Sequence, residues 1–537
     1  MESPRIEGRV DVLVVGAGPG GAVATHTLAT AGLSVVCLEQ GDWVDPGDLP
    51  GTKPEFELLT RGEWSVWPNE RRGVADYPLN VDDADVDPIM YNAVGGGSVM
   101  FGGHWMRLLP SDFRVRTLDG VADDWPIGYD DLEPFHQEVD RFIGVSGLAG
   151  DPAYPDHDYP LPPHPIGPGG VHLAKGMNKL GWHWWPGTNA IPSSAFKNMG
   201  QCVRWGLCER GCPVGAKASF DLAYWPHATA AGARLITGAR VARITVDHQG
   251  LASGAVWIDR SGTEHRIEAN AVVLAGNGIG TPRILLMSDD RHPDGLANSS
   301  GLVGKNLMVH PVTHAFGLYH EELEAWNGPA GQLLYTLEFA ETDRSRGFVR
   351  GTKWALMPPL GALHVLEQLR RRPFDERWGS QVHDIARHLG RTMTWSANID
   401  DLPEESNTVT LDPLRTDSSG LPGAKISYRM SENTRRMIEF TDDRMVEAHE
   451  AAGAVRVIRG EMTESGHLLG TARMGNDPRT SVVDRWGRAH DVPNLFIVDG
   501  SVMVTGGSVN PTANIAALSL RTARHIVETA RDQAVPA

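Results

Sequence analysis

The chain is poor in cysteine, in basic residues relative to acidic ones, and in long apolar runs. It has 4 cysteines in 537 residues, far fewer than a secreted domain held together by disulfides would use. Nowhere do about 18 consecutive apolar residues occur, which is the length that a membrane-spanning helix needs. The residues before Val10 have no apolar core that could act as a signal peptide. We therefore expect a cytoplasmic protein with no membrane span.

The charge balance is acidic, with 49 Lys and Arg against 67 Asp and Glu and a net charge of −18. This excess argues against a nucleic-acid partner. It would raise the local concentration of a cationic ligand, or it serves solubility alone. The composition, 41% hydrophobic and 22% charged, is that of an ordinary globular protein, and the length favours two domains.

The N-terminal segment predicts a strand, a glycine-rich turn, a helix and a second strand in that order. Val10 to Val15 is an apolar run bounded by glycine, as expected of a strand buried on both faces. An alanine-rich segment with helical spacing follows the turn and stops at Gly32, and Leu33 to Leu38 is the second strand. This order is typical of the start of a nucleotide-binding domain.

Three glycines and one acid complete a dinucleotide-binding fingerprint in this segment. Gly16 allows the tight turn, Gly18 lets the backbone approach a pyrophosphate, and Gly21 permits close packing of the helix. Glu39 follows the second strand, where its carboxylate can accept from ribose hydroxyls. An acid at this position favours FAD or NAD over NADP, whose extra phosphate it would repel.

The rest of the chain leaves this domain and returns to it. Residues 234–287 and 466–520 are glycine-punctuated strands and helices, whereas residues 312–462 mix short alternating runs with charged helical pieces such as Glu432 to Ala452. We predict an α/β protein with a Rossmann-like, doubly wound domain and a second α+β substrate domain on an antiparallel sheet. The predicted boundaries are 1–110, 215–311 and 463–537 for the first domain, 111–214 for covering segments that include a cysteine loop, and 312–462 for the second domain.

Four stretches, in family order, resemble the glucose-methanol-choline (GMC) family of FAD-dependent alcohol oxidoreductases: the fingerprint, Asn92 to Ser98, Gly276 to Ser288, and His467 to Thr512. The cysteine loop and residues 298–308 look most like bacterial FAD-dependent sugar dehydrogenases and pyranose-type oxidases. The resemblance implies that the first domain binds FAD. It implies FAD contacts at Gly16, Gly18, Gly21, Glu39, Gly96, Ser98, Val241, Asp499, Gly500, Asn510, Pro511 and Thr512.

Two residues in the last stretch are the candidate catalytic pair. Oxidation of an alcohol requires a base that removes the hydroxyl proton while hydride leaves the carbon for flavin N5, and a polar group that orients the hydroxyl. His467 stands where the family keeps its catalytic histidine, and Asn510 stands where members carry His or Asn. A neutral imidazole can take the proton near pH 7, and an amide can hold the oxygen without competing for that proton.

The residues beside the glycine-rich segment bear on how FAD is held. Some relatives attach the flavin covalently through a histidine, and Met100 stands at that position here. Because a thioether cannot form that bond, we predict noncovalent FAD. His104 and Trp105 follow shortly after, and they either face flavin or substrate or serve packing.

The cysteine loop allows more than one interpretation. Cys202, Cys208 and Cys212 have the Cys-x5-Cys-x3-Cys spacing that in the sugar dehydrogenases holds a [3Fe-4S] cluster. The alternatives are zinc or structural cysteines. With a cluster we expect a dehydrogenase that feeds a redox partner, and without one an oxidase that uses dioxygen.

The substrate prediction is a sugar, glycoside, cyclitol or aminosugar. Sixteen tryptophans supply faces on which sugar rings stack, although most of them can equally be core. Two narrower hypotheses fall within this class. One is an aminoglycoside-type sugar oxidase, and the other is an oxidase or dehydrogenase that acts on a pyranose or a glycoside. The alternatives are a sterol or long-chain alcohol oxidase, which needs a broad apolar cavity, and a flavin electron-transfer subunit without alcohol chemistry.

Overall fold

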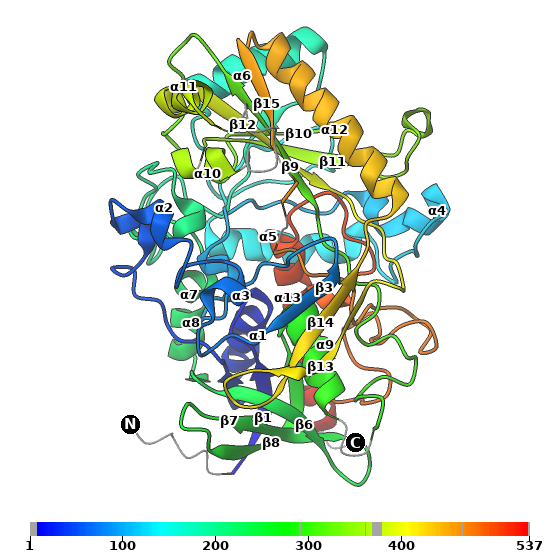
Figure 1. Ribbon diagram of the computed structural model, residues 1–537. Helices are drawn as coiled ribbons and strands as arrows, with labels where there is room; N and C mark the ends of the chain where they lie inside the picture. The colour runs from blue at the N-terminus through cyan, green and yellow to red at the C-terminus, as the bar shows by residue number, and fades with distance from the viewer. Residues whose placement is uncertain are drawn as a thin grey trace.

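The computed structural model describes residues 8–288, 292–359, 361–367, 378–460, 462–463 and 466–534. These residues form three sheets, with a mainly parallel sheet at one end of the molecule and an antiparallel sheet at the other (Figure 1). The predicted α/β class, with a Rossmann-like sheet and a second sheet of antiparallel strands, is confirmed.

The first sheet is built on the N-terminal fingerprint. Its parallel strands, in spatial order, are β5 (Arg234–Ile236), β2 (Val35–Leu38), β1 (Arg9–Val15), β8 (Glu264–Leu274) and β16 (Leu495–Ile497), and β7 (Ala252–Ile258) and β6 (Arg240–Val246) extend β8 in antiparallel fashion. All four residues of β2 are buried, as are Val12 to Val15 of β1. The predicted strand, helix and second strand are present. The burial of β1 and β2 agrees with their apolar sequences, because such runs are stable only in a sheet with both faces covered.

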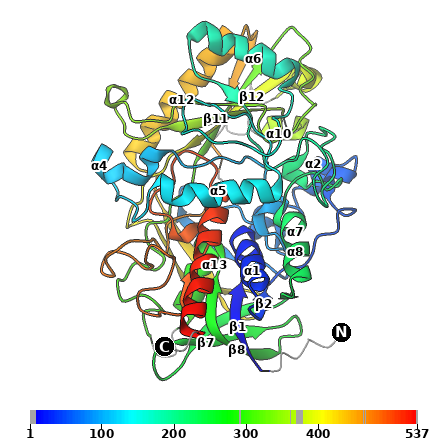
Figure 2. The same ribbon diagram turned by 180° about the vertical axis from the view of Figure 1, so that it is seen from behind.

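Helices cover this sheet on both faces. Helix α1 (Pro19–Thr30) begins directly after the glycine turn and packs beside the C-terminal helix α13 (Thr512–Ala534), which also contacts α5 (Tyr129–Ile143), as Figure 2 shows. Helix α9 (Asn277–Met287) packs against β6. The two ends of the chain thus meet in one domain, although 481 residues separate α1 from α13.

The second sheet carries one polar face and one apolar face. Its strands, in spatial order, are β15 (Arg456–Arg459), β9 (Val312–Leu318), β12 (Thr392–Ile399), β11 (Thr352–Met357), β10 (Leu334–Phe339) and β4 (Trp185–Pro186). In β12, Met393, Trp395 and Ala397 join the apolar cluster under α6 (Gly167–Leu180) and α12 (Glu432–Ala451). Because side chains alternate along a strand, the residues between them point to the opposite face, toward the first domain.

A third, smaller sheet joins a strand of the N-terminal segment to two strands of the segment 312–462. Strands β13 (Thr408–Thr416) and β14 (Pro422–Tyr428) form an antiparallel pair, and β14 pairs in parallel with β3 (Leu79–Ala84). The predicted segment 312–462 and the N-terminal segment therefore share a sheet. The remaining helices are α2 (Phe56–Leu59), α3 (Pro68–Arg71), α4 (Val115–Asp119), α7 (Phe220–Ala223), α8 (Trp225–Ala230), α10 (Ala362–Glu367) and α11 (Ser380–Arg387). In the described part of the chain, no helix combines the length and the apolar character that crossing a membrane requires.

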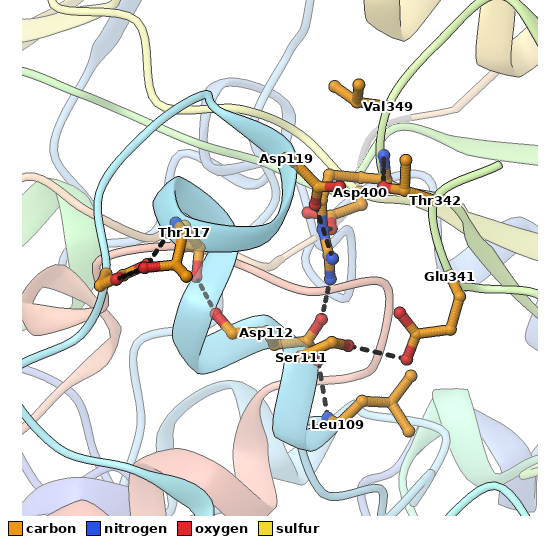
Figure 3. Close-up of polar contacts among 12 residues, drawn as sticks. Leu109, Ser111, Asp112, Thr117, Asp119, Glu341, Thr342, Val349 and Asp400 are labelled. Carbon is orange, nitrogen blue, oxygen red and sulfur yellow. Dashed lines mark hydrogen bonds and ion pairs between the residues drawn. The ribbon is translucent and has the colours of Figure 1, made fainter. Parts of the chain in front are cut away.

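A buried ion network joins the second sheet to residues 110–119, the segment that ends with α4. Asp112 and Asp119 of this segment converge with Asp400, which follows β12 (Figure 3). All three carboxylates bind the guanidinium of Arg350, whose Nε lies 3.0 Å from Asp400 and whose Nη1 lies 3.3 Å from Asp119. The carbonyl of Asp112 also accepts from Thr505 Oγ1 at 2.8 Å. The network therefore also fixes the loop that leads to Asn510.

Candidate active site

A cavity of about 910 Å³ extends from the first sheet to the polar face of the second. At one end it begins where β1, β2, β8 and β16 finish, with Gly16, Glu39, Gly276 and Asp499 in its wall. Ligands of doubly wound folds bind at this edge of the sheet. At the other end the wall comprises residues of β9, β11 and β12.

The wall near β1 is largely backbone, which suits a flat ligand that bears phosphates. A Cβ added to Gly97 would meet no atom within 4 Å, and one on Gly18 would meet only the Cα of Gly96, at 3.8 Å. Side chains at Gly18 or Gly97 would therefore project toward the cavity, and glycine leaves this space for a ligand. The N-terminus of α1 faces the same region, where backbone N–H groups favour phosphate. The residues present thus fit FAD.

Glu39 is buried at the end of β2 and lines the same wall. Its carboxylate accepts from the backbone N–H of Ala17 at 2.7 Å and of Gly41 at 2.8 Å. Burial raises the pKa of this carboxyl. Each oxygen has a second lone pair, so the group can still accept from ribose hydroxyls.

The structure brings nearly all the predicted FAD-contact residues to this one cavity. Those in its wall are Gly16, Gly18, Glu39, Gly96, Ser98, Val241, Asp499, Gly500, Asn510, Pro511 and Thr512. Gly21 is outside the wall, because it faces the backbone carbonyl of Gly16 and the side chain of Ala275. A Cβ built on Gly21 would lie 3.3 Å from the Cβ of Ala275. Its place in the fold is the close packing of α1 on the sheet.

Two of these side chains stabilise backbone turns that form the cavity wall. The carboxylate of Asp499 accepts from the backbone N–H of Asn277 and Ser501 and from the hydroxyl of Thr281. The hydroxyl of Ser98 donates to the carbonyl of Gly95 at 2.6 Å. These residues shape the cavity through the backbone that they fix.

His467 and Asn510 lie next to each other in the cavity wall. Asn510 Nδ2 is 3.4 Å from Nε2 of His467, and Nδ1 of His467 is 2.9 Å from Nδ1 of His310. When Asn510 donates to Nε2, the proton of His467 is on Nδ1 and is donated to His310. Nε2 is then the basic nitrogen of His467, and its lone pair accepts from Nδ2 of Asn510.

The surroundings of His467 keep its imidazole neutral. Burial lowers the pKa of His467 well below its ordinary value, and the neighbouring His310, His104 and Lys353 lower it further. Burial likewise lowers the pKa of His310 to about 4. A neutral histidine at pH 7 is a proton acceptor, which is the chemistry expected of a general base.

Sequence reasoning missed two members of this cluster, His310 and Lys353. His310 stands at the end of a loop and Lys353 in β11, and neither has a motif that marks it. Lys353 Nζ lies 3.2 Å from Nδ1 of His104 and 3.2 Å from Oδ1 of Asn510. His104 lines the cavity, whereas Trp105 is buried and donates its indole N–H to Asp140 at 2.7 Å, which is a packing role.

The polar face of the second sheet forms the far wall of the cavity. Thr394, Ser396 and Asn398 alternate along β12 and all line it. The hydroxyl of Thr394 and the amide nitrogen of Asn398 are buried and have no hydrogen-bond partner among the residues that the structure describes. Trp64 and Trp67 also line the cavity. Unsatisfied polar groups are costly when buried, so the wall is suited to a ligand that hydrogen-bonds to them.

The cysteine loop lies at a separate, small apolar pocket of about 30 Å³ that Cys202, Cys208 and Cys212 all line. Burial raises the pKa of the Cys202 thiol, and raises that of Cys208 to about 12, so without a bound metal both groups keep their protons at neutral pH. Among the described residues no three His, Cys, Asp or Glu side chains are arranged to hold a metal ion. The structure gives no support to an iron–sulfur cluster at this loop, and the cysteines fit a structural role.

Comparison with known proteins gives a consistent result. Residues 10–312 and 403–519 match the two sequence models described as GMC oxidoreductase. The chain is 41% identical over 534 residues to 2-methyl-1,2-propanediol dehydrogenase of Mycolicibacterium austroafricanum, covering 96% of this chain and 95% of the relative. It is 30% identical to paromamine 6'-oxidase of Streptomyces fradiae, covering 96% and 91%. The fold matches pyridoxine 4-oxidase from Mesorbium loti with a TM-score of 0.64 at 18% identity, covering 96% and 99%.

Proposed function

The chain belongs to the GMC oxidoreductase family, and on that premise we propose that it oxidises one CH–OH group of a small polyhydroxylated molecule with FAD as cofactor. The substrate class is a sugar, an aminosugar or a vicinal diol. It is defined by a second hydroxyl or amine close to the hydroxyl that reacts.

One observation carries this substrate class, namely the wall formed by Thr394, Ser396 and Asn398. Two of these side chains have buried polar atoms that find no partner in the described part of the chain, and the wall faces the same cavity as His467 and Asn510. A second hydroxyl of the substrate would satisfy them, whereas an alkyl chain or a sterol ring would leave them unpaired at about 1–3 kcal/mol each. The wall therefore favours a polyol over the sterol or long-chain alcohol alternative.

In the proposed reaction His467 accepts the hydroxyl proton of the substrate at Nε2. The substrate hydroxyl replaces the amide of Asn510 as the hydrogen-bond donor to Nε2, and the amide N–H then donates to the hydroxyl oxygen and orients it. FAD, when bound, supplies the oxidant that takes hydride from the substrate carbon. The imidazole of His310 receives the hydrogen bond from Nδ1 of His467 and so keeps Nε2 as the basic nitrogen. A flavin subunit that only carries electrons would need neither the base nor the amide.

We propose that FAD is held noncovalently. Met100 lines the cavity at the position where the resemblance would require a histidine, and a thioether forms no such link. Acid precipitation of the protein should therefore release all the flavin into the supernatant. Flavin that stays with the pellet would contradict this part of the proposal.

The decisive experiment is anaerobic reduction of the flavin by matched pairs of alcohols. Propane-1,2-diol is compared with propan-1-ol, and glucose, fructose and glucosamine are compared with decan-1-ol, by following the flavin band at about 450 nm. We expect the polyols to bleach the band and the mono-alcohols to act far more weakly. Equal rates for decanol and the polyols would refute the substrate class, and no reduction by any alcohol would refute the function.

A second measurement identifies the electron acceptor. The reduced enzyme is mixed with air-saturated buffer or, separately, with a quinone-type dye, and flavin reoxidation is followed. Rapid reoxidation by air defines an oxidase, and reoxidation by dye alone defines a dehydrogenase.

The Asn398→Leu variant tests the polar wall, because leucine is close to asparagine in volume but lacks the amide. It should raise KM for the diol while leaving KM for propan-1-ol unaffected.

A further inference from the structure

We propose that Lys353 is a positioning residue for the oxidation proposed above. It fixes the amide of Asn510 so that Nδ2 faces His467 and Nε2 of His467 stays the proton acceptor. The inference depends on the proposed function and adds to it a side chain that no sequence motif marks.

Lys353 lies in β11 on the face of the sheet that is turned to the cavity. It pairs with Asn398 of β12, and Met357, four residues along the same strand, pairs with Thr394. Asn398, Thr394 and Met357 all line the cavity. Because paired residues of adjacent strands project to the same face, the side chain of Lys353 projects toward the active site. It is only 1% exposed, so it ends beneath the wall and acts through its neighbours.

The ammonium group has two polar contacts, and neither partner carries a negative charge. Nζ lies 3.2 Å from Oδ1 of Asn510 and 3.2 Å from Nδ1 of His104. Nε2 of His104 donates to the carbonyl of Gly331 at 2.9 Å, which leaves Nδ1 as the acceptor. Within the described residues no carboxylate lies within ion-pair distance of Lys353. A buried lysine without a counter-ion is costly in a purely structural position, and such groups are concentrated at functional sites.

The contact with Asn510 decides which end of the amide faces the base. An amide has an acceptor end and a donor end. In its ammonium form Lys353 can only donate, so it selects Oδ1, and Nδ2 is then turned to Nε2 of His467. In the reversed amide, Oδ1 would face His467 and would favour a proton on Nε2. That tautomer cannot accept the substrate proton.

The charge of Lys353 acts in the same direction. The titratable groups that it acts on are His104 and His467, and His310 lies against His467. Burial lowers the pKa of Lys353 to about 7, and its positive charge lowers the pKa of His467 and His104. Removal of the charge should raise the pKa of His467, so the acid limb of kcat/KM should move to higher pH.

The test compares Lys353→Met with Lys353→Gln in the flavin-loaded enzyme, using the best polyol from the panel. Methionine removes both the donor and the charge. Glutamine keeps an N–H donor without the charge. We expect Lys353→Met to lower kcat at least about tenfold, part of the roughly 10²–10⁴ that a general base contributes, with a smaller change in KM. Lys353→Gln should recover much of kcat but keep the shifted acid limb.

Lys217→Met is the matched control. Lys217 is equally buried, and its Nζ donates to the carbonyls of Val99, Phe101 and Cys208, away from His467. It should lower Tm without moving the acid limb. The proposal is overturned if both Lys353 variants keep kcat within about threefold and keep the wild-type limb, or if Lys217→Met shifts the limb equally. A wild-type enzyme that oxidises no alcohol refutes the proposed function and leaves the Lys353 variants without a reaction to compare.

Discussion

Replacement of Arg350 by methionine should destabilise the protein more than any loss of a surface ion pair. Arg350 is 1% exposed and binds three buried carboxylates. Their residues are Asp112, which is 1% exposed, Asp119, which is 6% exposed, and Asp400, which is 2% exposed. Methionine has a similar length but no charge, so the variant leaves three carboxylates buried together. Removal of one partner of a buried ion pair costs about 3–5 kcal/mol, and three orphaned partners put this variant at the upper end.

The effect on Tm follows from the size of the chain. Unfolding entropy is about 2.1 cal/mol/K per residue, or about 1.1 kcal/mol/K for all 537 residues, so 3–5 kcal/mol lowers Tm by about 3–4 °C. A smaller cooperative unit would shift further, because its unfolding entropy is smaller. Since Asp112 joins the loop before Asn510 through Thr505, some loss of flavin affinity should accompany the shift.

The sign of the pH dependence distinguishes this mechanism from simple loss of packing. Burial raises the pKa of Asp112 and Asp400, and Arg350 opposes that rise. In the variant both pKa values rise further. A carboxyl with a raised folded-state pKa stabilises the fold below its unfolded pKa and loses that contribution as pH rises through the folded value. The difference between variant and wild type should therefore be small near pH 5 and larger at pH 8.

The assay is calorimetric Tm of the flavin-loaded protein at pH 5, 6, 7 and 8. Arg524→Met is the control, because Arg524 joins α13 to Glu138 of α5 in a pair that is about half exposed. An exposed pair contributes about 0–1 kcal/mol, so its Tm should be nearly unchanged. Equal losses for the two variants, or an Arg350→Met loss that does not grow with pH, would refute the reasoning.

Three further predictions concern the active site. His467→Gln should lower the rate of flavin reduction by roughly 10²–10⁴-fold in stopped-flow measurements, since the base is lost, while the protein still purifies with flavin; a colourless variant would mean that His467 serves binding instead. Gly97→Leu should fill the ligand space, so that the purified protein holds little flavin as measured by the ratio of its absorbance at 450 nm to that at 280 nm. Gly62 is also beside open space, and Gly62→Leu should retain the bound flavin. Because the pKa of His467 is well below the ordinary value of about 6.5, kcat/KM for the wild type should fall only at pH below that ordinary value; a fall centred at or above it would contradict a neutral base.

Much of the first domain could be predicted because its signals are local. The run Val10 to Val15 and the glycines after it specify a strand, a tight turn and a helix within a few consecutive residues. The spacing also brings Glu39 to the same edge of the sheet, since parallel strands end together. His467 and Asn510 were found for a different reason, because each lies in a recognisable motif.

Other features required the assembled chain. The hydroxyl of Thr394 and the amide of Asn398 look like ordinary strand positions until β12 is placed against the cavity. The cysteine spacing alone leaves an iron–sulfur cluster, zinc and structural cysteines open, because spacing does not fix where sulfurs point or how deeply they are buried. The folded loop favours neutral thiols.

The nucleotide-binding edge is thus a property of consecutive residues, because turn geometry and strand burial act over a few positions. The catalytic environment is a property of contacts between distant ones. Lys353 approaches Asn510 across 157 positions, and His310 approaches His467 across the same number. Their hydrogen bonds form only after the second sheet has packed on the first domain, and burial there lowers the pKa values of these groups.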